Sequence, residues 1–148
     1  MTVLVAVIRI YGAMIEARLP GGMLLVEQMR GELAGVGVPE SLFILIIPLI
    51  SGLAVGINVG TIGASFPVLL SLLGPSPQLH VLLPTVVLAY AAGFMGQILS
   101  PVHVCLVVTN QYFKTSLLRS LNGLLLPVAV VLAGTYCFTL LLHFLLAG

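Results

Sequence analysis

Apolar residues dominate this chain, and polar residues interrupt them at only a few places. The interruptions divide the sequence into four segments, residues 1–40, 41–77, 78–113 and 114–148. Between Ser41 and Phe113 there is no Asp, Glu, Lys or Arg. Uncharged apolar runs of this length predict helices that cross or enter a lipid bilayer, because about 20 apolar residues span its hydrocarbon core. We therefore predict an all-α membrane protein.

The first and last segments predict ordinary membrane helices with charged residues beside them. Residues 2–19 are long enough to span, while residues 23–34 predict either a surface helix or a solvated connector. Residues 122–146 form a last spanning helix in this interpretation. Lys114 and Arg119 precede it, and the positive-inside rule places the loop that holds them in the cytoplasm.

Residues 41–77 predict a hairpin of two short helices. Its arms, residues 41–56 and 61–74, would be roughly 24 and 21 Å long, which is less than the hydrocarbon core of about 30 Å. A polar, glycine-rich sequence lies between the arms, from Gly56 to Thr61. Two short apolar helices around such a tip predict a re-entrant hairpin, which enters the membrane and returns to the same side.

Residues 78–113 predict a transmembrane helix that is broken near its middle. The helix-breaking and polar residues there are Gly93, Gly96, Gln97, Ser100, Pro101 and His103. Irregular backbone at membrane depth survives only where it is buried in protein or lines a wet cavity. Ser100 and Pro101 favour a new helix start, since serine is a common N-cap and proline is common at the first helical position. The amide groups of such a start attract anions.

The two irregular stretches supply the candidate solute-binding and ion-binding residues. These are Asn58, Gly60, Thr61, Gln97, Ser100 and His103. Asn58 and Thr61 offer neutral oxygen atoms, so Na⁺ beside them is one expected coupling ion. A proton at His103 is the other, because imidazole changes its charge near neutral pH. The alternative interpretation is structural, in which the same polar groups satisfy neighbouring backbone where the helices are irregular.

Composition argues against several other classes of protein. Only 6% of residues are charged and the net charge is +1, which leaves no basic surface for nucleic acid. Cys105 and Cys137 lack CxxC spacing and a companion histidine cluster, so no metal centre or other cofactor is predicted. Ser100 and His103 are poorly placed for a nucleophile and its base, and we therefore do not expect an enzyme.

With these residues in view, the chain resembles a known family. The strings GLAVGINVGTIGASFPVLL and AYAAGFMGQILSPVHVCLVVTNQYF look like the C-terminal part of an uncharacterised prokaryotic integral membrane family, domain of unknown function number four hundred and one. That family belongs to the ion transporter superfamily, with divalent-anion/sodium symporters as distant relatives. The resemblance implies two inverted repeats in a multi-pass protein of the plasma membrane. It also implies a homodimer that works by elevator-type alternating access.

The sequence therefore favours the C-terminal half of a secondary active transporter for a small anionic or organic solute, coupled to H⁺ or Na⁺. In this interpretation the chain is one half of an inverted-repeat fold, with a re-entrant hairpin and a broken transmembrane helix. The missing N-terminal repeat is then supplied in cis or in trans, by a longer chain or a split subunit. The alternative function is a small homo-oligomeric membrane scaffold or channel subunit with no transport site of its own.

Overall fold

A computed structural model describes residues 6, 10, 40–74 and 77–147 of the chain, and in this part the fold is all-α with no strand. The helices of residues 40–74 and 77–147 are α3 (Glu40–Val55), α4 (Asn58–Leu73), α5 (Leu79–Ile98), α6 (Val104–Tyr112) and α7 (Leu117–Ala147). The predicted first membrane segment and surface connector, residues 1–39, lie outside the described residues apart from Ala6 and Ile10.

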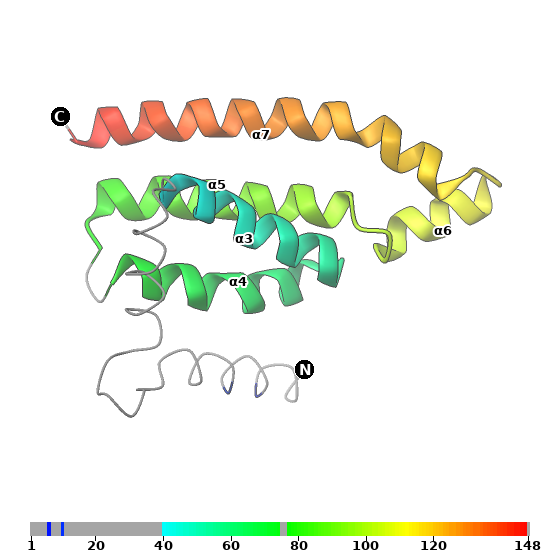
Figure 1. Ribbon diagram of the computed structural model, residues 1–148, viewed down its shortest axis with the longest axis horizontal. Helices are drawn as coiled ribbons and strands as arrows, with labels where there is room; N and C mark the ends of the chain where they lie inside the picture. The colour runs from blue at the N-terminus through cyan, green and yellow to red at the C-terminus, as the bar shows by residue number, and fades with distance from the viewer. Residues whose placement is uncertain (1–5, 7–9, 11–39, 75–76, 148) are drawn as a thin grey trace.

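Helix α5 lies at the centre of the described fold. It makes its most extensive contact with α3, and it also packs against α4 and α7. Figure 1 shows that α3, α4, α5 and α7 run roughly side by side, while α6 extends beyond the end of α5. The end of α3, the start of α4 and the end of α5 lie at the same end of this bundle. The two breaks predicted from the sequence therefore lie close together in space.

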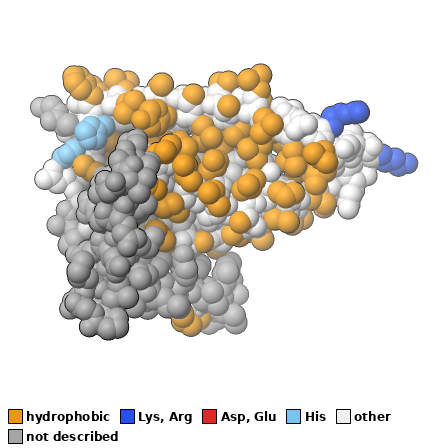
Figure 2. Space-filling model, in the orientation of Figure 1, with side chains coloured by type: hydrophobic (Ala, Val, Ile, Leu, Met, Phe, Trp, Pro, Cys, Tyr) orange, Lys and Arg blue, Asp and Glu red, His pale blue; other side chains and the backbone are white. Residues whose placement is uncertain are grey.

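Helices α5 and α7 are long and apolar enough to cross a membrane, over Leu79–Ile98 and Leu117–Leu146. Most large apolar side chains of α7 are exposed in the described structure, as expected for a helix that contacts lipid tails. Figure 2 shows apolar side chains over much of the visible face, with the basic side chains at one end. The described basic residues are Lys114 and Arg119, in and just after the α6–α7 loop, and both are exposed.

The first break is shorter than the sequence predicted. Only Gly56 and Ile57 separate α3 from α4, so Asn58 to Thr61 form the first turn of a helix instead of a loop. The amide of Thr61 already donates a helical hydrogen bond to the carbonyl of Ile57, at 3.0 Å. Both α3 and α4 contain 16 residues, which corresponds to about 24 Å each.

The second break falls later than predicted. Helix α5 continues through Gly93 and Gly96 to Ile98, and α6 begins at Val104 instead of Pro101. Helix α5 alone therefore has 20 residues, about 30 Å, and the break lies at its end instead of the middle of one span. A glycine inside a helix costs only about 1 kcal/mol, and these glycines are packed against α3.

The turn between α6 and α7 is closed by Asn110. Asn110 is buried, and its side-chain oxygen accepts hydrogen bonds from the hydroxyls of Thr115 and Ser120, at 2.6 and 2.5 Å. These bonds fix the start of α7 against α6. Helix α7 accordingly begins at Leu117, earlier than the predicted start at Asn122.

Candidate functional site

Helices α3 and α5 touch backbone to backbone because glycines stand at the contact. A Cβ atom added at Gly52 would lie 2.8 Å from the amide nitrogen of Gln97 and nearer still to the carbonyl oxygen of Gly93. One added at Gly96 would lie 2.9 Å from the carbonyl carbon of Leu49. Small residues allow membrane helices to approach in this way. Gly52 therefore serves helix packing.

This contact places the first break directly against the second. Gly56 is buried and has φ +66°, a left-handed conformation that glycine adopts at little cost. A Cβ atom there would lie 2.9 Å from Cγ2 of Val102 and 3.0 Å from Oγ of Ser100. Glycine is thus needed at this position both for the backbone turn and for the space beside the second break.

Ser100 bonds the two breaks together. Its side chain is fully buried, and its hydroxyl donates to the carbonyl oxygen of Leu53 at 2.7 Å. The same oxygen accepts a hydrogen bond from the amide of Val102 at 3.3 Å. The carbonyl of Leu53 belongs to the last turn of α3, where carbonyls have no partner within their own helix. Ser100 therefore satisfies the end of α3 and is not the predicted N-cap of the following helix.

His103 makes a second bond between the breaks and is itself the N-cap of α6. Its Nδ1 atom lies 3.0 Å from the carbonyl oxygen of Gly56. A carbonyl oxygen can only accept, so Nδ1 must carry the proton and donate it. In the neutral ring, Nε2 is then left as the acceptor. The backbone of the first break thus selects the tautomer of the imidazole at the second.

Gln97 is a buried amide whose hydrogen bonds the protein leaves incomplete. It is 8% exposed, and among the described residues its Oε1 is the one buried side-chain atom without a hydrogen-bond partner. Its Nε2 lies 3.5 Å from Nδ1 of His103, where two donors face each other and no good bond forms. A buried polar atom left unpaired costs about 1–3 kcal/mol. This unmet requirement indicates a place where a ligand can act.

Two helices begin at this junction of the breaks, and neither start is capped by a side-chain hydrogen bond. The N-cap of α4 is Ile57, and that of α6 is His103. The first amide groups of a helix have no partner within it and carry about half a positive charge together. Helix starts therefore attract anions, and residues 41–113 hold no Lys or Arg that would add a charge.

Asn58 and Thr61 lie in the first turn of α4, where their oxygens were predicted as Na⁺ ligands. The Asn58 amide makes a long bond of 3.4 Å to the hydroxyl of Tyr90. The Thr61 hydroxyl donates to the carbonyl of Ile57 at 3.0 Å, and the Thr61 carbonyl accepts from the hydroxyl of Ser65 at 2.7 Å. A sodium ion coordinated by these carbonyls would have to displace the hydroxyls that now occupy them, and the sodium site stays a prediction.

The remaining predicted residue, Gly60, makes room inside the hairpin. A Cβ atom at Gly60 would lie 2.5 Å from Cγ1 of Val55, at the end of α3. The structure thus brings Ser100 and His103 against the first break, with Gln97 beside His103. The other three residues, Asn58, Gly60 and Thr61, lie along the first turn of α4 instead. Among the described residues, no hydrogen bond joins them to the second break.

Sequence reasoning missed Tyr90, which reaches Asn58 from α5. It lies two helical turns before Gln97, and residues so spaced share one face of a helix. A polar side chain repeated at this spacing in an apolar helix is the signal that could have identified it. The carbonyls of Leu53 and Gly56 were also missed, since no sequence pattern marks which carbonyl a distant side chain will reach.

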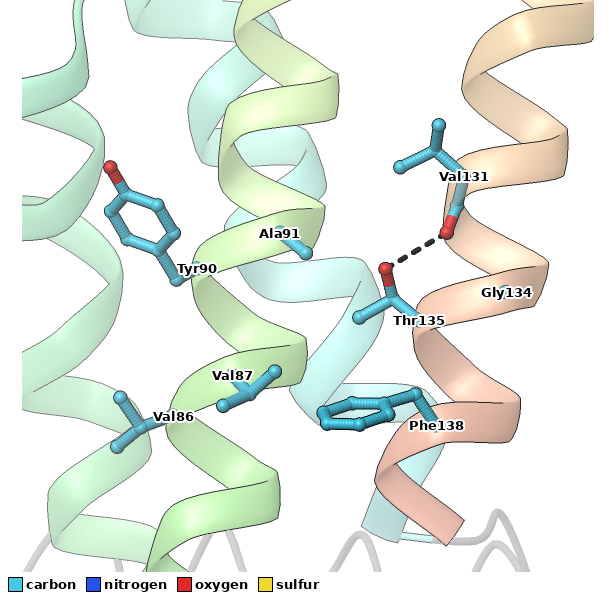
Figure 3. Close-up of a pocket in the computed structure, with 8 residues that line it drawn as sticks. All are labelled: Val86, Val87, Tyr90, Ala91, Val131, Gly134, Thr135 and Phe138. Carbon is cyan, nitrogen blue, oxygen red and sulfur yellow. Dashed lines mark hydrogen bonds between the residues drawn. The ribbon is translucent and has the colours of Figure 1, made fainter. Parts of the chain in front are cut away.

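A separate groove of about 630 Å³ lies between α5 and α7. Figure 3 shows Val131 and Phe138 on the α7 side, and Tyr90 pointing away from α7. The Thr135 hydroxyl donates to the Val131 carbonyl at 2.9 Å and is thereby satisfied within its own helix. This apolar groove offers little to a charged solute, so the junction of the breaks is the candidate site.

Comparison with known proteins gives one match. The profile of a family described as Protein of unknown function (DUF401) matches residues 1–142. No curated protein and no solved structure matches the chain. The matched range includes both breaks and every residue of the candidate site.

Proposed function

We propose that this chain, which belongs to the DUF401 family, is one half of a secondary active transporter for a small anionic solute. The solute binds at the junction of the two helix breaks, and its movement is coupled to H⁺ or Na⁺. In this proposal the chain is distantly related to the divalent-anion/sodium symporters of the ion transporter superfamily. A second, inverted repeat then completes the site in cis or in trans, and the complete transporter is a homodimer.

The observation that carries the proposal is the pair of hydrogen bonds between the breaks, Ser100 to Leu53 and His103 to Gly56. Helix ends that are buried away from water leave backbone groups that cost several kcal/mol each when unpaired. Here the two interruptions pair with each other, which supports two helix breaks held together at one place, as the proposal requires. An anchor or a simple spanning helix gains nothing from two such interruptions.

The balance of donors and acceptors at the junction favours an anion. The carbonyls of Leu53, Gly56 and Ile57 already accept hydrogen bonds from side chains. The starts of α4 and α6 lack side-chain caps, so their first amides stay available as donors. With these amides free as donors, a carboxylate, sulfate or phosphate group fits the helix starts. The buried Oε1 of Gln97 lacks a donor, so it suits a hydroxyl or protonated group of the same solute.

In the proposed membrane arrangement α3 and α4 form the re-entrant hairpin, since about 24 Å is too short to span the core. Helices α5 and α7 cross the bilayer. The α6–α7 loop with Lys114 and Arg119 faces the cytoplasm, by the positive-inside rule. The hairpin then enters from, and returns to, the outer side.

A substitution at Gln97 tests the site with little risk to the fold. Gln97→Leu keeps the approximate volume and removes the buried unpaired amide, so stability should be equal or higher. Gln111→Leu is the matched control, because Gln111 is exposed on α6. Membrane vesicles from cells that express the chain with its neighbouring reading frames are assayed for accumulation of radiolabelled succinate, gluconate and sulfate.

We expect the wild type and Gln111→Leu to accumulate at least one of these probes, and Gln97→Leu to lose the accumulation. If Gln97→Leu accumulates a probe to the same level as the wild type, the assignment of the site is wrong. A stable homo-oligomer that conducts ions through liposomes, but accumulates none of the probes, would favour the scaffold or channel subunit.

A further inference from the structure

We propose that the coupling ion is a proton and that it is carried on Nε2 of His103. The inference rests on the proposed transport function and names the coupling ion of that same site. The proton comes from water on one side of the membrane, binds the free lone pair of the neutral imidazole, and leaves on the other side. The proton leaves a hydronium ion, so one O–H bond breaks as the N–H bond forms, and the reverse exchange with water releases it on the other side.

The geometry singles out Nε2. Nδ1–H donates a hydrogen bond to the carbonyl oxygen of Gly56 at 3.0 Å. Nδ1 therefore keeps its proton whether the ring is neutral or charged. The ring is only half-buried, and Nε2 has no hydrogen-bond partner among the described residues. Protonation at Nε2 therefore adds a charge at the junction without breaking the bond between the two breaks.

No other side chain of α3, α4 or α5 at this junction changes its charge near neutral pH. The one titratable residue of α3 and α4 is Glu40, at the start of α3, and residues 41–74 contain none. Helix α5 contributes Tyr90, a phenol that is neutral in this pH range. The other histidine of α5, His80, lies at its opposite end, where its ring packs 5.7 Å from that of His143.

Helices α6 and α7 add no competing group beside His103. On α6 the titratable residues are Cys105 and Tyr112, both exposed. Lys114 and Arg119 follow the far end of α6, roughly 13 Å along the helix from its start. The remaining titratable residues of α7, Tyr136, Cys137 and His143, lie on its later turns, alongside α5.

The position of His103 makes proton and anion binding interdependent. As the N-cap of α6, His103 stands at the helix start that is proposed to bind the anion. An anion bound there attracts the positive charge that a proton adds to the ring. By linkage, the proton strengthens anion binding by the same factor by which the anion strengthens proton binding. Joint binding of both is the requirement for a symporter.

Nitrogen-15 NMR of the full chain labelled at histidine tests the atom assignment without a solute. The signals of His103 are identified as those lost in His103→Asn. We expect the neutral ring to carry its proton on Nδ1, and the charged ring to carry protons on both Nδ1 and Nε2. A neutral ring with its proton on Nε2 would overturn the assignment.

The same vesicles and three labelled probes test the coupling. His103→Asn keeps an amide nitrogen where Nδ1 donates to Gly56 but cannot take a second proton. His80→Asn is the control, at the far end of α5. We expect an inward proton gradient to drive accumulation in wild type and His80→Asn, and not in His103→Asn. Apparent affinity in wild type should rise by up to about tenfold per pH unit of acidification.

The outcomes separate the two proposals. Accumulation driven by a sodium gradient alone, or equal proton-driven accumulation in His103→Asn, overturns the proton inference and leaves the transport function standing. No accumulation of any probe under either gradient overturns the transport function, and the inference with it.

Discussion

The substitution Gly52→Ala adds one methyl group at the contact between α3 and α5 and tests that contact directly. In Gly52→Ala the new Cβ would lie 2.8 Å from the backbone nitrogen of Gln97, and nearer still to the carbonyl of Gly93. Ordinary van der Waals contact begins at 3.4 Å. The helices must therefore separate by at least about 0.6 Å, because backbone atoms cannot rotate away as a flexible side chain can.

That separation reaches the junction, because Leu53 follows Gly52 directly. The 2.7 Å bond from Ser100 to the carbonyl of Leu53 would lengthen to roughly 3.3 Å, beyond the ordinary range for two oxygens. Overpacking costs about 1–3 kcal/mol, and weakening the buried bond adds about 1 kcal/mol. The expected loss of unfolding free energy from packing is therefore about 2–4 kcal/mol.

Gly123→Ala and Gly134→Ala are the matched controls in α7. A Cβ atom at either position has no neighbour within 4 Å, so only the helix propensity changes, by up to about 1 kcal/mol in favour of alanine. Subtracting a control from Gly52→Ala removes this propensity and leaves the packing cost. Thermal unfolding of the purified full chain in detergent measures the difference. Equal midpoints for Gly52→Ala and the controls would refute the close helix contact.

Three further results are expected. Asn110→Ala should lower unfolding free energy by about 1–3 kcal/mol, since it removes the acceptor of the Thr115 hydroxyl; a midpoint equal to wild type contradicts this. Ser100→Ala should cost a similar amount, because it leaves the carbonyl of Leu53 unpaired, and Ser100→Thr should recover part of the loss if the hydroxyl is what matters. Trypsin should cleave after Lys114 in inside-out vesicles only, and cleavage after Lys114 in right-side-out vesicles would reverse the proposed orientation.

The positions of the breaks were predicted within a few residues, whereas the ends of the helices were not. Glycine, proline and polar residues in an apolar run mark where a helix is weak, so the sequence indicated both interruptions. Gly93 and Gly96 belong to the same set of residues yet lie inside α5. Glycine lowers helix stability by about 1 kcal/mol but also permits close packing, and only the neighbour decides which effect prevails.

Of the candidate site, Gln97, Ser100 and His103 were chosen from the sequence and do gather beside the first break. Their roles were not predictable in the same way. The serine before a proline favoured a local N-cap, but its hydroxyl bonds the end of another helix instead. Whether such a hydroxyl bonds a local or a distant backbone partner depends on which carbonyl lies within about 3 Å of it.

Composition and spacing alone determined that this chain is apolar, nearly uncharged over residues 41–113, helical, and interrupted at two places. These properties follow from local chemistry, since each depends on residues close together along the chain. Only the tertiary structure decided that the interruptions meet, that Nδ1 of His103 is the protonated nitrogen, and that the Gln97 amide is left unpaired. The physical reason is that hydrogen bonds between residues 47 positions apart depend on how closely α3 approaches α5.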